Sequence, residues 1–179
     1  MKKIINILTL LSLSFVIYSC SDDLTLQKYY IDKQDSKDFI SLDVPASVIQ
    51  LKADVPDEAR EAYESLKKMN ILAFAKNENN QATLIEEQAK VKSILKNNRY
   101  KELMTFKDKG RNVVVKYEGD TDKIDEVIVF ASDKDQGFAL VRVLGDNMNP
   151  AKIAKLANSI SDIDSEGFKQ LGDLFKNKK

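Results

Sequence analysis

Apolar residues recur at helical spacing in two segments of the chain. Between about residues 54 and 69, beginning at Asp54 or Pro56, five of them fall on one helical stripe: Ala59, Ala62, Tyr63, Leu66 and Met69. Leu84, Val91 and Ile94 or Leu95 mark the buried side of a second helix over residues 81–97. Each stripe is one-sided, so both helices are predicted to pack on a core.

Other segments alternate apolar and polar residues, which is the period of a strand with one buried face. "FISLDVP" at residues 39–45 has this alternation, and the strand is expected to end at Pro45. A short helix is suggested after it by Val48, Ile49 and Leu51. "NILAFAK" predicts a further short strand. From residue 101, four strand-like runs are separated by turn-forming residues: "ELMTFKD", "RNVVVKYEG", "KIDEVIVFASD" and "GFALVRVLG". We therefore expect an antiparallel meander over about residues 101–145.

The meander is followed by more helical sequence. Asn149 as N-cap and Pro150 at the first helical position predict a helix with Ile153, Leu156, Ala157 and Ile160 on one stripe. A last amphipathic segment, "SEGFKQLGDLF", is expected to bury Phe168, Leu171 and Phe175. The order of elements predicts an α+β fold, with an antiparallel β-sheet and helices from both flanks of the meander packed on one of its faces.

The two central strands of the meander are apolar on both sides. If Val127, Val129 and Ala131 point toward the helices, Ile128 and Phe130 point away from them, because successive side chains in a strand face opposite ways. Either the amino-terminal helices or a terminal segment cover the second face, or part of it is exposed for docking. In the second case, we expect the face formed by five residues to bind a partner protein or another copy of the chain: Val114, Ile128, Phe130, Val141 and Val143.

The amino terminus has the pattern of a targeting segment. Lys2 and Lys3 precede an apolar stretch from Ile4 to Tyr18, of about 15 residues, which is shorter than the roughly 20 that cross a bilayer as a helix. "IYSC" then places Ser19 directly before Cys20, and this resembles the lipobox of bacterial lipoproteins. The resemblance implies lipidation of the Cys20 thiol and attachment to the membrane through that lipid. An unmodified cysteine in an ordinary signal peptide, or a membrane-inserted start, is the alternative.

This interpretation divides the chain into a lipoprotein signal peptide at residues 1–19, a lipid-anchored tether at 20–37 and a single α+β domain at 38–179. "SDD" after Cys20 is similar to the acidic tag of surface-exported lipoproteins of Bacteroidetes, although a solvated linker would have the same composition. We expect an outer-membrane lipoprotein in the cell envelope, on the periplasmic side or at the cell surface.

Composition narrows the function classes. The 28 basic and 28 acidic side chains balance, so no net field attracts nucleic acid, and no nucleic-acid partner is expected. Histidine is absent, which removes the usual proton shuttle and a common metal ligand. With one cysteine no intramolecular disulfide can form. No cofactor is predicted.

Two patterns of reactive side chains favour structural roles. Ser-x-x-Lys occurs at Ser65 and at Ser93, as often as chance allows, and without the partner motifs of penicillin-recognising enzymes. "DTDKIDE" and "DKDQG" gather carboxylates, but neither completes a calcium loop, so hairpin turns explain them and no metal site is predicted. Paired carboxylates serving acid and base chemistry remain an alternative.

Longer segments point to a family. The lipobox, the meander "YKELMTFKDKGRNVVVKYEGDTDKIDEVIVF" and "FALVRVLGDNMNPAKIAKLA" resemble the DUF4252 family of Bacteroidetes lipoproteins, whose function is unknown. The resemblance implies an envelope role and gives no catalytic residues. We expect a non-catalytic, lipid-anchored domain that binds a partner or serves an envelope response, and the alternative is a periplasmic or surface hydrolase using carboxylates.

Overall fold

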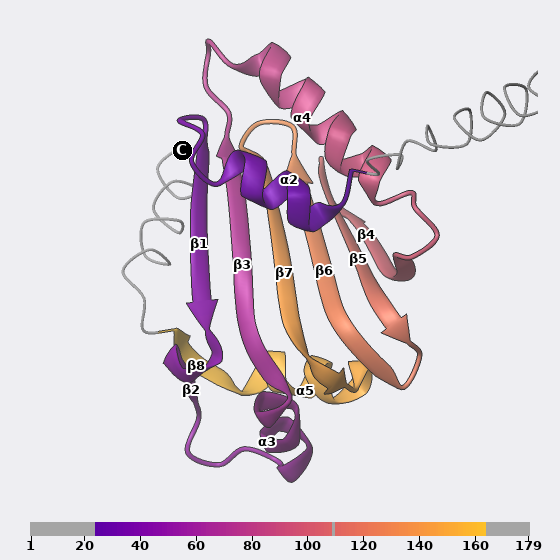
Figure 1. Cartoon of the computed structure of the whole chain (residues 1–179). Coiled ribbons are helices and arrows are strands. Elements are labelled where there is room, and N and C mark those ends of the chain that lie inside the picture. Colours follow the sequence, from indigo (N-terminus) through magenta and orange to yellow (C-terminus); the bar gives the residue numbers. More distant parts are fainter. Residues whose placement is uncertain (1–23, 109, 164–179) are drawn as a thin grey trace, which may run out of the picture.

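A six-stranded antiparallel sheet forms the centre of the molecule (Figure 1). The computed structural model describes residues 24–108 and 110–163. The strands follow one another across the sheet in the order β1 (Phe39–Pro45), β3 (Leu66–Ala75), β7 (Gly137–Met148), β6 (Lys123–Asp133), β5 (Arg111–Asp120) and β4 (Lys101–Asp108). The predicted α+β class and the meander, which forms β4 to β7, are confirmed.

Two helices lie across one face of this sheet, α2 (Leu26–Lys33) and α4 (Gln81–Ile94) (Figure 1). We call this side the α2/α4 face. Its core joins Tyr29 of α2 and Val91 of α4 to aromatic and aliphatic strand residues, among them Phe74 and Phe138, whose rings stack with centroids 5.7 Å apart. All four side chains are at most 2% exposed, so this half of the sheet is sealed from water.

The opposite face is partly covered by the remaining elements: the short helix η1 (Ala46–Val48), β2 (Ile49–Leu51) paired with β8 (Ile160–Ile163), α3 (Asp57–Glu64) and α5 (Pro150–Ser159). Ile49 and Tyr63 pack against Ile71 of β3. Ile153 of α5 packs with Val127 and other residues of β5 to β7. The ion pair of Lys155 with Glu58, at 2.7 Å, joins α5 to α3.

The expectation that helices from both flanks share one face of the meander is therefore wrong. The stripe of α5 is one-sided as predicted, but a stripe shows only that a helix is buried, and not on which face of the sheet. Asn147, with φ of 51°, lies near the end of β7, and the Asn149 side chain accepts hydrogen bonds from the backbone N–H groups of Ala151 and Lys152. The helix that begins there contacts the opposite face.

Two predicted boundaries also differ from the structure. The helix predicted from residue 54 to 69 ends at Glu64, and Leu66 and Met69 lie in β3, because this segment forms strand hydrogen bonds with both β1 and β7. The tether predicted over residues 20–37 contains α2, whose Leu26, Tyr29 and Tyr30 are buried. The folded domain therefore begins before residue 38.

The hairpin between β6 and β7 has a glycine that its geometry requires. Asp133 accepts backbone hydrogen bonds from Asp135 and Gln136, which closes the turn of the "DKDQG" segment. Gly137 then has φ of 121°, and a Cβ atom there would collide with the carbonyl oxygen of Phe74. Only glycine accommodates this conformation without strain.

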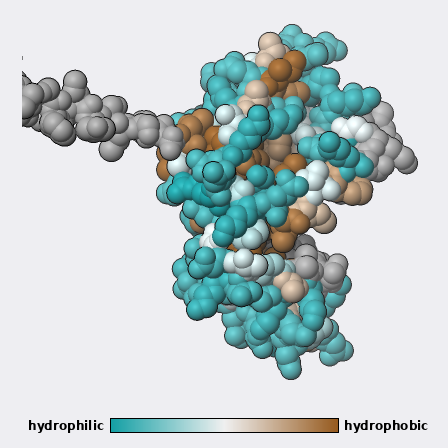
Figure 2. All heavy atoms as spheres, turned by 90° about the vertical axis from the view of Figure 1, so that its right-hand side faces the viewer, coloured by the Kyte–Doolittle hydropathy of each residue, from teal (hydrophilic) through white to brown (hydrophobic). Residues whose placement is uncertain are grey.

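Strand β4 is the outer edge of the sheet and pairs only with β5. Three of its apolar side chains are about half exposed: Leu103, Met104 and Phe106. Figure 2, which faces this side of the molecule, shows hydrophobic areas interspersed among hydrophilic ones. Within the described residues, no helix combines the length and apolar character needed to cross a membrane.

Candidate functional site

A row of polar side chains crosses the α2/α4 face where the helices stop covering it. Residues paired across neighbouring strands form rungs, and one rung runs from Asp43 through Asn70, Arg142 and Ile128 to Lys116. The next rung toward the helices is almost entirely apolar: Ser41, Leu72, Leu140, Phe130 and Val114. The change from apolar to polar between two adjacent rungs places a polar floor beside α2.

The centre of this floor is a buried ion pair between β7 and β6. Nε and Nη2 of Arg142 donate to the two carboxylate oxygens of Glu126, at 2.7 and 2.8 Å. Their side chains are 6% and 9% exposed. Burial disfavours the charged guanidinium, but the hydrogen bonds and charge of Glu126 outweigh it and hold the pKa of Arg142 above its usual value. The guanidinium of Arg142 is therefore charged, and its two hydrogen bonds to Glu126 fix its orientation.

A second polar group joins α2 to the same floor. The Tyr30 hydroxyl donates to Asp43 at 2.7 Å and lies 2.7 Å from the Ser41 hydroxyl, and the Asn70 amide also donates to Asp43. Burial has the largest effect on the pKa of Tyr30; the hydrogen bond to Ser41 opposes it, and the hydrogen bond and charge of Asp43 act with it, so that this pKa is raised to about 12. Tyr30 is therefore a neutral hydrogen-bonding group at physiological pH.

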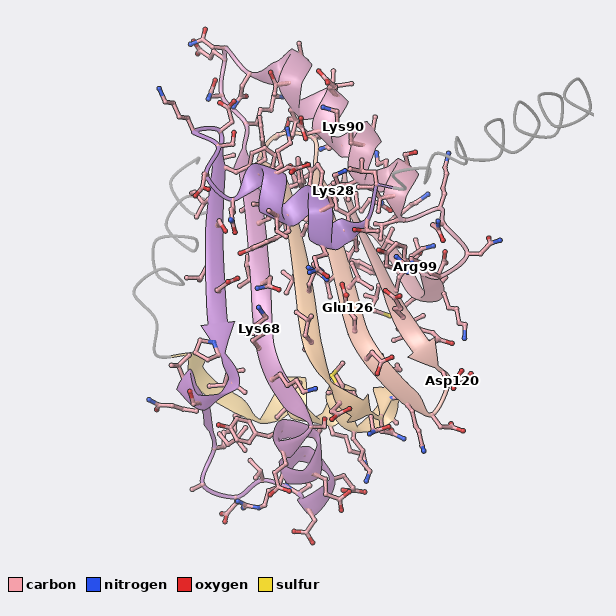
Figure 3. All side chains as sticks on the ribbon, in the orientation of Figure 1. Lys28, Lys68, Lys90, Arg99, Asp120 and Glu126 are labelled. Atoms are coloured by element: carbon pink, nitrogen blue, oxygen red, sulfur yellow. The ribbon has the colours of Figure 1, made fainter. Side chains whose placement is uncertain are left out.

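Between α2 and this floor lies a hollow of about 300 Å³. It is lined from the helix by Gln27, Tyr30, Ile31 and Gln34, and from the sheet by Asp43, Lys68, Asn70, Arg142 and Leu144. Figure 3 shows Lys68 and Glu126 on the part of the sheet that α2 leaves uncovered. We call this feature the α2 hollow. Its polar groups come from four separate elements, so it exists only in the folded chain.

A third polar cluster fixes the two helices to each other. Glu87 of α4, 3% exposed, accepts from the Tyr29 hydroxyl at 2.8 Å, from Lys33 at 2.8 Å and from Lys90 at 3.0 Å. Burial opposes ionisation of Glu87, yet these three hydrogen bonds together lower its pKa. Burial and the contact with Glu87 raise the pKa of Tyr29 far above its ordinary value. The side chains of Tyr29, Lys33 and Lys90 all donate hydrogen bonds to Glu87, and this cluster therefore holds α2 in place beside the hollow.

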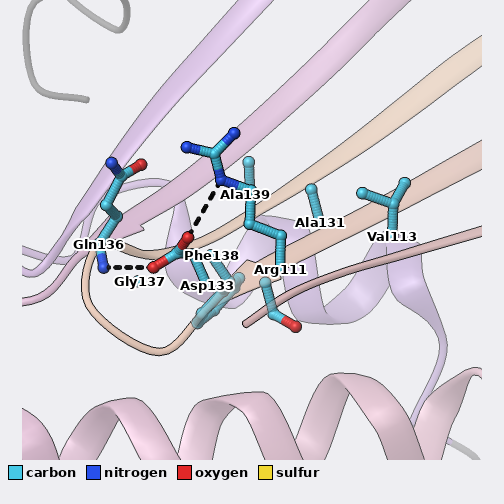
Figure 4. A pocket seen from close by; sticks show the side chains of 9 residues that line it. Arg111, Val113, Ala131, Asp133, Gln136, Gly137, Phe138 and Ala139 are labelled. Carbon is cyan, nitrogen blue, oxygen red and sulfur yellow. Dashed lines mark hydrogen bonds and ion pairs between the residues drawn. The ribbon is translucent and has the colours of Figure 1, made fainter. Parts of the chain in front are cut away.

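The opposite face carries a second hollow of about 400 Å³ near the β6–β7 turn (Figure 4). Small and apolar side chains line much of it, including Val113, Ala131 and Ala139. At its rim Arg111 pairs with Asp133 at 3.3 Å. Arg111 and Asp133 are paired with each other, and Asp133 also accepts the hydrogen bonds that close the turn. The hollow is therefore a mainly apolar cavity whose charged side chains already have partners.

The five residues of the predicted interaction face lie on two different sides of the sheet. Val114, Ile128 and Phe130 are on the α2/α4 face, where Ile128 is 0% and Phe130 1% exposed, whereas Val141 and Val143 lie on the opposite face. The prediction of one accessible face is therefore wrong. The prediction assumed the wrong register between β6 and β7. Val141 is paired with Val129 and Phe130 with Leu140, so Val141 and Phe130 face opposite sides of the sheet. Cys20 and the segment with Phe168, Leu171 and Phe175 lie outside the described residues.

The acidic clusters separate in the structure. Asp120 at the end of β5, Asp122 in the turn and Asp125 in β6 are exposed, whereas Glu126 points inward to Arg142. Over the described residues, no three histidine, cysteine, aspartate or glutamate side chains are positioned to hold a metal ion. Ser65 donates to the carbonyl of Ala62 at the end of α3, while Lys68 lies in β3, so this Ser-x-x-Lys pair does not share a helix.

Sequence reasoning missed the residues of the α2 hollow, although part of the signal was present. Glu126 and Arg142 are charged residues at core-facing positions of the two strands that are otherwise apolar on both sides. Opposite charges in neighbouring core strands are a sign of a buried pair. Tyr30 and Asn70 carried no such signal, because their places depend on where α2 lies.

The fold and the site define a class: a small α+β domain in which two helices cover half of one face of an antiparallel sheet and leave a polar hollow beside them. The chain belongs to the family described as domain of unknown function DUF4252, whose model matches residues 29–156. The match covers every strand of the large sheet, all of α4, and α2 from Tyr29 onward. No curated protein and no solved structure matches the chain.

Proposed function

We propose that this protein is a lipid-anchored binding domain of the bacterial cell envelope, an outer-membrane lipoprotein of the Bacteroidetes type. Its ligand would occupy the α2 hollow. The observation that carries the proposal is the convergence of Tyr30, Asp43, Asn70 and Arg142 on one hollow, each already oriented by hydrogen bonds to its neighbours. Side chains fixed in this way bind a ligand without losing further conformational freedom.

The charges around the hollow favour a neutral ligand. The charge of Arg142 is neutralised by Glu126. The other charged residue types at the hollow are Asp43 and Lys68, whose opposite formal charges cancel. The rest of the lining offers amide groups of Gln27, Gln34 and Asn70, which both donate and accept hydrogen bonds. Paired donors and acceptors match adjacent hydroxyl groups, so the proposed ligand is a neutral, hydroxyl-rich molecule such as a sugar unit of an envelope glycan.

A hydrolase using carboxylates has less support. A general acid needs a carboxyl group whose proton can reach the substrate, and a raised pKa helps to keep that proton in place. Glu126 uses both oxygens on Arg142, and Asp43 accepts hydrogen bonds from Tyr30 and Asn70. These contacts direct the carboxylate oxygens toward the protein, which suits a binding floor better than acid catalysis.

The anchor is proposed from the "IYSC" pattern at Cys20. The described fold begins at Leu24, and its first helix at Leu26. Leu26 lies six residues beyond Cys20, and six residues span at most about 22 Å, so a lipid on Cys20 would hold the start of α2 within that distance of the membrane surface. Two or three acyl chains make such attachment effectively permanent.

The ligand proposal is tested by titrating the full chain in detergent with a panel of neutral monosaccharides and disaccharides, and with acidic sugars for comparison. Binding is followed by calorimetry and by amide chemical shifts. Gln34→Ala and Lys68→Ala change the exposed lip of the hollow, while Gln81→Ala and Lys92→Ala are matched changes on exposed positions of α4. We expect neutral sugars to shift amides around Tyr30 and Asn70, and only the first pair of variants to weaken the effect. Shifts confined to other regions would contradict the proposal.

The anchor is tested separately by metabolic labelling with a fatty acid. We expect the label on the native chain and none on Cys20→Ser, which should accumulate as an unprocessed precursor. Label retained after this substitution would rule out lipidation at Cys20, and it would leave the assignment of the hollow unaffected.

A further inference from the structure

The guanidinium of Arg142 has hydrogen-bond donors that the fold leaves unused. Of its five N–H groups, one on Nε and one on Nη2 are bonded to Glu126. Among the described residues, the only completely buried side-chain nitrogen or oxygen without a partner is Oδ1 of Asn112. Nη1 of Arg142 has no partner there either, so it reaches open space, and the space that Arg142 lines is the α2 hollow. The floor of the hollow therefore presents a donor that Glu126 holds in a fixed orientation.

Asp43 offers an acceptor at the same hollow. Tyr30 and Asn70 both donate to Oδ1 of its carboxylate, and over the described part of the chain Oδ2 accepts no hydrogen bond. Asp43 and Arg142 are the two neighbours of Asn70 in one rung, and two strand spacings, about 10 Å, separate their Cα atoms. A donor and an acceptor therefore lie on opposite sides of one space.

Two apolar side chains border this space. Leu144 follows Arg142 by two residues along β7, which places it on the same face and about 7 Å away. Ile31 lines the hollow from α2 and is 54% exposed, although it lies beside a polar floor. The hollow thus combines an oriented donor, an acceptor and an apolar contact within the reach of one small chemical group.

We propose that the ligand of the α2 hollow is a sugar that carries an acetamido group, an inference that rests on the proposed function and makes its ligand class more specific. The carbonyl oxygen of this group accepts from Arg142, and its N–H group donates to Oδ2 of Asp43. Its methyl group packs on Ile31 and Leu144. A secondary amide is planar and trans, so it donates and accepts in nearly opposite directions, as a backbone amide does between two neighbouring strands.

The arrangement distinguishes the acetamido group from other substituents of sugars. A hydroxyl group has a single oxygen, which does not reach from Arg142 to Asp43, and it has no carbon for the apolar contact. A carboxylate would add a second anion beside Asp43 and compete with Glu126 for a guanidinium whose charge is already matched. A protonated amino group would pair with Asp43 and leave the donors of Arg142 unused.

The test compares sugars that differ at one position. N-acetylglucosamine and glucose share the same ring and differ only in the acetamido group, and glucosamine carries a charged amine at that position. Each sugar is titrated into the full chain in detergent and followed by calorimetry. We expect N-acetylglucosamine to bind at least about tenfold more tightly than glucose or glucosamine, which corresponds to the gain of one hydrogen bond to a charged group.

Two changes of the hollow should reduce this preference. Glu126→Leu with Arg142→Met removes the donor together with its counter-charge and should bring the affinities for N-acetylglucosamine and glucose close to each other. Ile31→Ser removes the apolar contact at an exposed position and should lower the preference about threefold. Ile85→Ser, the matched control, removes an isoleucine of similar exposure, 62%, from α4 and should leave the preference unchanged.

The outcomes separate a failure of this assignment from a failure of the proposed function. Equal binding of N-acetylglucosamine and glucose would overturn the acetamido assignment and leave the hollow as a site for neutral sugars. A preference that survives both changes of the hollow would place the acetamido group elsewhere and overturn it as well. A peptide offers the same amide, so tighter binding of N-acetylalanine N-methylamide would assign the hollow to a peptide. Binding of none of the sugars would refute the proposed function and this assignment together.

Discussion

Replacing Glu126 by leucine should strongly destabilise the protein, because it leaves the guanidinium of Arg142 buried without a counter-charge. The two hydrogen bonds of the pair are 2.7 and 2.8 Å long, and the Arg142 side chain is 6% exposed. Water therefore reaches little of the guanidinium and would replace the lost carboxylate only in part. Removing one partner of such a pair costs about 3–5 kcal/mol.

The expected size of the effect can be expressed as a thermal shift. For a domain of this length each kcal/mol lowers Tm by about 2–4 °C, so Glu126→Leu should lower it by roughly 10 °C. Replacing both partners, with Glu126→Leu and Arg142→Met, removes the buried charge altogether. Since hydrophobic replacements of buried ion pairs are often neutral or stabilising, the double variant should recover most of the loss.

The assay is urea unfolding of the native chain, the two single variants and the double variant, which together form a double-mutant cycle. We expect the double variant to be more stable than either single variant. A loss below about 1 kcal/mol for Glu126→Leu would place the pair in the range of solvent-exposed ion pairs and refute the reasoning. Additive losses in the double variant would show that the two residues do not interact.

Three further predictions follow from the same structure. Because the pKa of Glu87 is lowered, its ionisation stabilises the fold above the ordinary pKa of 4.5, and this contribution is lost as the pH falls through the lowered value. Glu87→Gln should therefore make the free energy of unfolding less dependent on pH in the acid range. An unchanged slope would contradict the role of the cluster. Phe130→Ala should cost about 3–5 kcal/mol in urea unfolding because a large, fully buried side chain is removed, while Phe106→Ala, at the exposed edge, should cost far less. Gly137→Ala should prevent normal folding, as measured by circular dichroism, and a native-like spectrum with an unchanged Tm would show that the β6–β7 turn can relax.

Much of the fold could be predicted because local patterns decide it. The four strands of the meander alternate or run apolar between clear turn residues, and α4 buries Leu84, Val91 and Ile94 as the pattern predicts, so these elements form where the pattern placed them. α2 was missed because eight residues with only Leu26, Tyr29 and Tyr30 on the buried side give a weak signal. β3 was predicted too short because its first half, with Lys67 and Lys68, has no strand pattern and becomes a strand through pairing with β1 and β7.

The site could be predicted much less well, since it depends on register. Both sides of β6 and β7 are apolar, so shifting the assignment by one residue changes which side chains face α2 and α4 without changing the pattern. The predicted interaction face mixed residues of both sides for this reason. The α2 hollow depends further on contacts over long sequence distances, such as Tyr30 with Asp43 and Asn70 with Arg142, which no local window contains.

The exposed edge strand β4 has a consequence for solubility. A strand that pairs on one side only, and whose Leu103, Met104 and Phe106 are about half exposed, is a template for joining two sheets edge to edge. Antiparallel pairing of two such strands centred on Met104 would set Lys101 against Lys107 of the other copy, and pairing centred on Thr105 would set Glu102 against Asp108. Like charges directly opposite each other are unfavourable. The charge pattern of β4 thus opposes these two registers, and substitutions that neutralise Lys101 or Glu102 are expected to make the protein aggregate at concentrations where the native chain stays in solution.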